Sequence, residues 1–183
     1  MKHPALVVLG VALSVVAHAH QSTMISIRNI TPDLAGVHIA NWQLKRSVEL
    51  VSEKGLVLVV GYPAPGSDPA ARDIWFDVEN PNWSTGKSIV FVARADHAIK
   101  LSVSFMDRNR VVYTSWTELR AGEWQTVQIR LSEIRPNPYF QPPDAKKGAP
   151  LDVSEVTRIG VAAQDPGAGR LAIGRIFLRT DDY

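Results

Sequence analysis

Residues 99–106 read Ile-Lys-Leu-Ser-Val-Ser-Phe-Met, with an apolar side chain at every odd-numbered position. Successive side chains of a β-strand point to opposite faces of a sheet, so this alternation predicts a strand with one buried face. The same period of two recurs at residues 74–78 and 127–131. The stretch therefore favours a β-sheet protein. No segment of the chain has the period of an amphipathic helix of ordinary length.

Further candidate strands follow one another at short intervals along the chain. Together with the three above, the set is 24–30, 36–42, 47–51, 56–62, 74–78, 88–95, 99–106, 111–116, 127–131, 158–163 and 171–179. Turns that contain Pro, Gly, Asp or Asn separate them, for example residues 31–33 and 165–167. Many short strands at this spacing predict an all-β fold, a two-sheet antiparallel β-sandwich of the jelly-roll type.

The N-terminus has the pattern of a secretory signal peptide. Lys2 supplies a positive charge, residues 5–16 carry none, and Ala17-His18-Ala19 has small residues where a signal peptidase cleaves. The apolar run is shorter than the roughly 20 residues that a membrane-spanning helix needs. We therefore expect residues 1–19 to be removed and residues 20–183 to form one periplasmic or secreted domain without membrane insertion.

Composition narrows the function further. The chain has no cysteine, which excludes disulfides, thiol catalysis and thiolate metal sites. Its 20 Lys and Arg against 18 Asp and Glu become 19 against 18 once Lys2 is removed. This near balance gives no electrostatic reason to expect a nucleic acid partner. We expect no cofactor.

Residues 135–150 interrupt the strand pattern. They contain five prolines and the aromatic pair Tyr139-Phe140, and they have no regular period. Two interpretations remain open: a lid that covers one end of the core with the two aromatic rings, or an ordered binding loop on a rigid sandwich.

Two segments carry a resemblance to known proteins. Residues 122–134 (GEWQTVQIRLSEI) and 151–161 (LDVSEVTRIGV) resemble strands of galactose-binding-like jelly rolls. Family 11 carbohydrate-binding modules and the complex I intermediate-associated protein family share this arrangement, and the similarity extends over roughly residues 72–179. It implies the jelly-roll fold, with Trp124 and the turn at Asp152 holding the sheets and the loop in place. The closing strand of those families often contains an aspartate, and Gly174 occupies that position here.

Outward positions of the predicted strands combine aromatic and polar side chains. The candidate ligand-binding residues are Trp75, Asp77, Arg94, Trp116, Gln128 and Arg130. Sugar rings stack their apolar faces on aromatic rings, and their hydroxyls need polar partners. If these strands are neighbours in one sheet, its open face suits a saccharide. Alternatively, other segments cover Trp75 and Trp116, and the chain is a protein-interaction module that uses a sheet face or the proline-rich loop.

Catalysis has little support in the sequence. Asp73 and Asp77 could act as an acid–base pair, but their Cα atoms would lie about 13 Å apart along a strand, whereas the carboxyl groups of glycosidases lie roughly 5–9.5 Å apart. No G-x-S-x-G motif or glycine-rich phosphate loop is present. We therefore expect a binding module and not an enzyme.

Histidine leaves one minor alternative. If the mature chain begins at His20, its amino group and imidazole offer two nitrogen ligands for copper. His38 or His97 would have to provide the third, as in the histidine brace of lytic polysaccharide monooxygenases, although no other motif of that family matches. Otherwise His38 is a hydrogen-bonded strand residue and His97 belongs to a hairpin turn.

Overall fold

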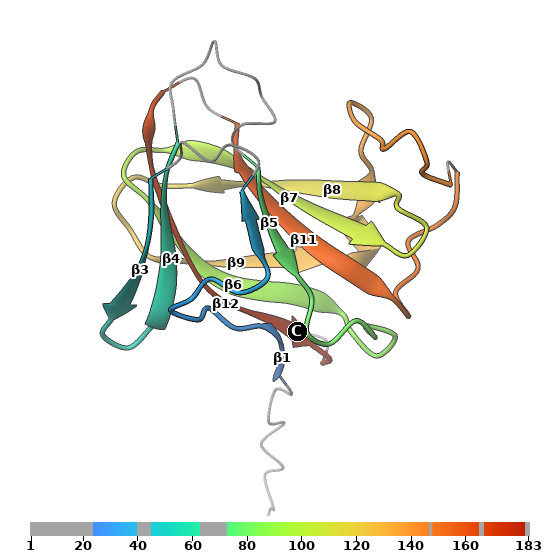
Figure 1. Ribbon diagram of the computed structural model, residues 1–183, viewed down its shortest axis with the longest axis horizontal. Helices are drawn as coiled ribbons and strands as arrows, with labels where there is room; N and C mark the ends of the chain where they lie inside the picture. The colour runs from blue at the N-terminus through green and yellow to red at the C-terminus, as the bar shows by residue number, and fades with distance from the viewer. Residues whose placement is uncertain (1–23, 40–44, 63–72, 147, 165–166, 182–183) are drawn as a thin grey trace, which may run out of the picture.

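The computed structural model describes residues 24–39, 45–62, 73–146, 148–164 and 167–181. In these residues the chain forms two six-stranded sheets that pack face to face (Figure 1). Sheet A has the order β3 (Arg46–Val51), β4 (Gly55–Tyr62), β12 (Gly169–Arg179), β6 (Ser88–Ala95) and β9 (Gln125–Arg130), and β1 (Met24–Arg28) also pairs with β12. Sheet B has the order β10 (Arg135–Pro136), β8 (Val112–Leu119), β7 (Ile99–Asp107), β11 (Val156–Ala163), β5 (Ile74–Asp77) and β2 (Val37–Ile39).

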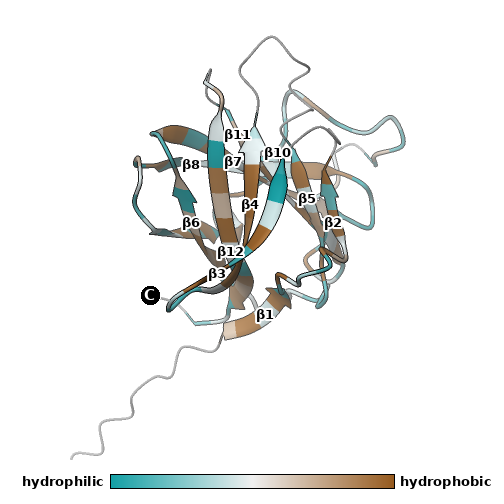
Figure 2. Cartoon of the chain, turned by 60° about the vertical axis from the view of Figure 1, so that its left-hand side comes forward, coloured by the Kyte–Doolittle hydropathy of each residue, from teal (hydrophilic) through white to brown (hydrophobic). Residues whose placement is uncertain are grey.

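The prediction of an all-β sandwich of the jelly-roll type is confirmed. All named strand pairs are antiparallel, and the last strand, β12, lies between β4 and β6, so chain neighbours are often not sheet neighbours. In Figure 2 the hydrophobic colour runs through the strands, whereas the loops are mostly hydrophilic. No helix among the described residues is long and apolar enough to cross a membrane. The predicted signal peptide and His20 lie outside the described residues.

The core between the sheets is built from the alternation seen in the sequence. The odd-numbered residues of β7, Ile99 to Phe105, are buried in it. Its largest fully buried side chain is Trp83, whose ring meets Phe105 edge-on at 5.9 Å between centroids. The indole N–H of Trp83 donates to the Asn80 carbonyl oxygen at 2.9 Å. The connection between β5 and β6 therefore anchors the core as well as joining the two sheets.

The proline-rich loop is ordered by side-chain hydrogen bonds to strand β8 and to itself. The Gln141 side chain donates to the Val112 carbonyl oxygen at 2.7 Å and accepts from the Val112 N–H at 2.9 Å. The Asn137 Oδ1 accepts from the backbone N–H groups of Tyr139 and Phe140. The two rings are 87% and 57% exposed, so the interpretation that they cover the core is wrong. The loop instead presents them to solvent.

The turn at Asp152 holds the end of this loop, as the resemblance implies. Asp152 accepts hydrogen bonds from the Ser154 N–H and hydroxyl and forms a salt bridge with Arg108 at 2.8 Å. These contacts with Ser154 and Arg108 hold the pKa of Asp152 below its usual value. The hydroxyl of Tyr113 donates to the Ala149 carbonyl, and burial, followed by the charges of Asp107 and Asp152, raises the pKa of Tyr113 to about 12.

Gly174, where the related families often have an aspartate, lies at an irregularity in the pairing of β12 with β6. A Cβ atom at this position would lie 2.6 Å from Cγ2 of Val92. Because that distance is a clash, the side chain of Val92 occupies the space that an aspartate would need.

Candidate functional site

The outer face of sheet A, the face turned away from the core, carries apolar side chains that a solvent-exposed sheet does not require. On β4, Leu58 and Val60 belong to the core, whereas Val57 and Val59 are buried on the opposite side of the same strand. Val90 of β6 is likewise buried outside the core. Other side chains on this face must therefore cover these valines.

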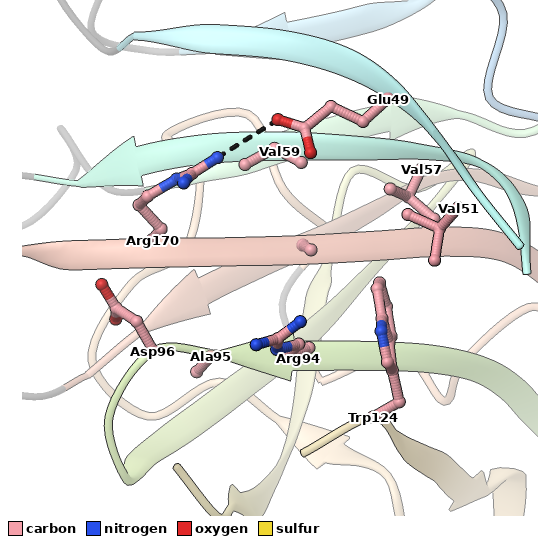
Figure 3. A pocket seen from close by; sticks show the side chains of 10 residues that line it. Glu49, Val51, Val57, Val59, Arg94, Ala95, Asp96, Trp124 and Arg170 are labelled. Carbon is pink, nitrogen blue, oxygen red and sulfur yellow. Dashed lines mark hydrogen bonds and ion pairs between the residues drawn. The ribbon is translucent and has the colours of Figure 1, made fainter. Parts of the chain in front are cut away.

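Val57 and Val59 lie at the bottom of a groove on the outer face, and larger side chains around the groove shield them from solvent. It runs over β3, β4, β12 and β6, and its lining is Glu49, Val51, Val57, Val59, Arg94, Ala95, Asp96, Trp124, Arg170 and Ala172 (Figure 3). The valines and Ala172 form an apolar floor, and charged side chains stand around it. In Figure 3 the ring of Trp124 lies across β6 and points toward β12 and the side chain of Val51.

Trp124 is the aromatic wall of the groove. Its side chain is partly exposed and does not belong to the core between the sheets. The expectation that Trp124 holds the two sheets together is therefore wrong, because the residue lies on the outer face of sheet A. The sequence did contain a signal for this position: Val127 and Ile129 point inward, so Trp124 shares the outward parity of Gln128 and Arg130.

The charges of the groove are only partly paired. Arg170 donates to Oε1 of Glu49 at 3.1 Å, across β4 (Figure 3). Asp96 contacts Nδ1 of His97 at 2.9 Å. Arg94, between Trp124 and Asp96 in the lining, forms no salt bridge with another described residue. Its guanidinium is exposed and can donate to a ligand.

The structure does not bring the six predicted ligand residues together. Arg94, Gln128 and Arg130 lie on β6 and β9 in sheet A, whereas Trp75, Asp77 and Trp116 lie on β5 and β8 in sheet B. The condition under which the six residues would share one open face, strands that are neighbours in one sheet, is therefore not met. Only Arg94 lines the groove; Gln128 and Arg130 line a separate hollow near Ser88, where Gln128 donates to the Ser88 hydroxyl at 3.1 Å.

On sheet B, Trp75 and Asp77 contact their own neighbours. A Cβ atom at Gly160 would lie 3.0 Å from three atoms of the Trp75 ring, so the ring packs directly on that glycine. Asp77 contacts Nε2 of His38 at 2.8 Å and accepts from Arg158 at 3.2 Å. Burial raises the pKa of Asp77, but the hydrogen bond and charge of His38 and the charge of Arg158 lower it by more, so that it lies below 3.8.

Trp116 is the other predicted aromatic residue, and it is 40% exposed. The ammonium of Lys100 lies 5.6 Å from its ring centroid, a cation–π contact. Tyr139 and Gln164 complete a shallow hollow around these two residues. This aromatic surface lies on sheet B, away from the groove on sheet A.

The histidines of the copper alternative have other partners. His38 is a strand residue bonded to Asp77, and His97 lies in the turn between β6 and β7, where Nε2 is 3.3 Å from the Tyr62 hydroxyl. Both match their ordinary interpretations. In the described part of the chain, no three His, Asp or Glu side chains gather where they could hold a metal ion.

Known structures share this architecture. The family 11 carbohydrate-binding module from Clostridium thermocellum, solved with a β-1,3-1,4-mixed-linked tetrasaccharide, is 17% identical, and the match covers 85% of this chain and 95% of that one with a TM-score of 0.65. A family 30 carbohydrate-binding module of a Clostridium thermocellum cellulosomal cellulase is 13% identical over 88% of this chain and 99% of that one, with a TM-score of 0.61. The chain therefore shares the two-sheet jelly-roll fold of these modules.

Enzymes also contain this fold as one part. An exo-β-agarase matches 87% of this chain but only 25% of its own, with 15% identity and a TM-score of 0.61. The family 11 and family 30 modules, by contrast, are matched over 95% and 99% of their own length. No protein-family profile matches the sequence, and neither does any curated protein.

Proposed function

We propose that this protein is a non-catalytic module that binds a saccharide in the groove on the outer face of sheet A. The observation that carries the proposal is Trp124, a partly exposed ring beside an apolar floor with polar groups around it. An indole face stacks on the C–H face of a sugar ring, and the side chains of Arg94, Glu49 and Arg170 can donate to or accept from its hydroxyls. The saccharide complex of the family 11 module supports the same ligand class.

Affinity electrophoresis of residues 20–183 in gels that contain a panel of soluble polysaccharides tests this proposal. At least one polysaccharide should retard the wild type, and Trp124→Ala should remove that retardation with the fold retained. Trp116→Ala, on sheet B, is the matched control and should migrate like the wild type. Retardation that survives Trp124→Ala but disappears in Trp116→Ala would place the site on sheet B and contradict the proposal.

The second candidate function is protein docking, which the exposed aromatic residues of the proline-rich loop favour. The backbone N–H groups of Tyr139 and Phe140 donate to Asn137, the two side chains are exposed, and Tyr139 lines one hollow together with Trp116 of β8. Exposed aromatic clusters are enriched at interaction surfaces. If no polysaccharide retards the wild type, a crosslinker placed at residue 139 that captures one protein partner in cells, and loses it on Phe140→Ala, would establish this function instead.

We also propose that the protein is exported and acts in the periplasm or outside the cell. The support is the signal-peptide pattern of residues 1–19. Intact mass spectrometry of the exported protein should give the mass of residues 20–183. Full-length protein confined to the cytoplasm would contradict export, and a first residue other than His20 would exclude the copper alternative.

A further inference from the structure

The outer face of sheet A continues beyond the groove into a second hollow. Its floor is Val90, Val92 and Phe177, and its charged lining is Glu53, Lys54, Arg175 and Arg179. The groove and this hollow both lie over β6 and β12. They therefore form two parts of one extended surface, as an elongated polymer would require.

Cations follow the central strand of this surface. Arg170, Arg175 and Arg179 lie along β12. Arg94, on the neighbouring strand β6, pairs with Ala172 of β12. The distance from residue 170 to residue 179 is about 30 Å at a strand rise near 3.3 Å per residue. The combined lining contains more cations than carboxylates: Lys54, Arg94, Arg170, Arg175 and Arg179 against Glu49, Glu53 and Asp96.

Two of these arginines lack an acidic partner within the described residues. Arg170 pairs with Glu49 at 3.1 Å, and Arg179 lies 3.8 Å from Asp181. Arg94 and Arg175, by contrast, form no salt bridge with another described residue. The guanidinium of Arg175 lies 5.8 Å from the Phe177 ring centroid, which positions the charge above the apolar floor. A guanidinium that is held in place without an acidic partner is suited to bind a carboxylate or sulfate with two hydrogen bonds.

We propose that the saccharide is an acidic polysaccharide, with carboxylate or sulfate groups bound by Arg94 and Arg175 while Trp124 stacks on a sugar ring. This inference rests on the proposed function and specifies its ligand class. A sugar polymer fits better than a nucleic acid because the floor between the arginines is apolar and the whole chain carries a formal charge of only +2. The repeated acidic groups of such a polymer match a row of cations along one strand.

Matched pairs of polymers test the inference, since each pair differs mainly in acidic groups. Polygalacturonate is compared with fully methyl-esterified pectin for the carboxylate, and κ-carrageenan with agarose for the sulfate. We expect the acidic member of one pair to retard the wild type more strongly than its neutral counterpart. The pair in which this occurs identifies the acidic group.

Arginine variants then test the assigned residues. Arg94→Gln and Arg175→Gln should each weaken binding of the acidic polymer by about tenfold, the loss expected for one charge-assisted hydrogen bond. Arg158→Gln removes a guanidinium from sheet B and should leave the affinity unchanged. Melting curves of all three variants confirm that they are folded.

The outcomes separate the two proposals. If a neutral polymer binds as tightly as its acidic counterpart, or if both groove variants bind like the wild type, the acidic ligand class is wrong and saccharide binding stands. Equal binding of duplex DNA that Trp124→Ala does not weaken would show unspecific polyanion binding and would also overturn the inference. If no polymer of either kind retards the protein, the proposed function itself fails.

Discussion

The outer faces of the two sheets use similar side chains in different ways. On sheet B the carboxylate of Asp77 is bound by His38 and Arg158, and the ring of Trp75 packs on Gly160. On sheet A the ring of Trp124 forms one side of a groove, and Arg94 has no acidic partner among the described residues. A face whose polar groups already bond to one another has little left for a ligand. Outward aromatic and charged residues therefore indicate a site only where their neighbours leave them without partners.

Trp83→Ala should have the largest effect, because this ring serves neither outer face. Trp83 is fully buried against Phe105, so its removal leaves a cavity and should cost about 3–5 kcal/mol of unfolding free energy. Urea denaturation followed by circular dichroism measures the loss. Trp124→Ala gives the comparison and should cost clearly less, since its ring is partly exposed. Equal losses would mean that Trp124 is a core residue and that the groove is an incidental feature of packing.

Glycine-to-alanine changes on the two faces should differ in size. At Gly160 the added methyl would lie 3.0 Å from Trp75 ring atoms, and such overpacking costs roughly 1–3 kcal/mol. Gly61, on β4 of sheet A, is the matched control, because its new Cβ would meet nothing closer than Lys45 at 3.8 Å. Thermal unfolding should show a lower melting temperature for Gly160→Ala and little change for Gly61→Ala. If both variants melt like the wild type, Trp75 is not packed tightly on Gly160.

Asp77→Asn should have the smallest effect, and that effect should depend on pH. Folding lowers the pKa of Asp77 below 3.8, so its negative charge stabilises the native state at neutral pH. The contribution is lost as the pH falls below about 4. Because this carboxylate is 45% exposed, we expect a cost of about 0.5 kcal/mol or less at pH 7. Melting temperatures of wild type and variant should differ at pH 7 and converge once the pH has fallen below the lowered pKa of the Asp77 carboxyl; a gap that persists there would contradict the pairing with His38 and Arg158.

The strands could be predicted because alternation is a local property. Residues 88–95 coincide with β6, and 99–106 end one residue before β7 does, since the side chains of each strand meet a core on one side only. The division into sheets could not be predicted. It depends on which distant strands pair, for example β12 with both β4 and β6, and nothing in one strand's own sequence specifies its partner.

The site could be predicted only in part, because alternation indicates which way a side chain points but not which strands are neighbours. Parity placed Arg94 outward, and it lines the groove, but the sequence could not show that Trp75 lies on the opposite sheet. The resemblance gives Trp124 a structural role, although its position relative to the inward-pointing Val127 indicates a side chain on the outer face. Trp83 was missed because it follows a turn, where no period indicates burial.

The indole N–H resonances of the protein's five tryptophans test the central claim most directly. In a titration of the 15N-labelled protein with an oligosaccharide of the polymer that retards it, we predict that the Trp124 resonance moves and that those of Trp75 and Trp116 stay in place. Single Trp→Phe variants assign the signals. Movement of the Trp75 or Trp116 resonance with Trp124 unchanged would place the ligand on sheet B and contradict the account.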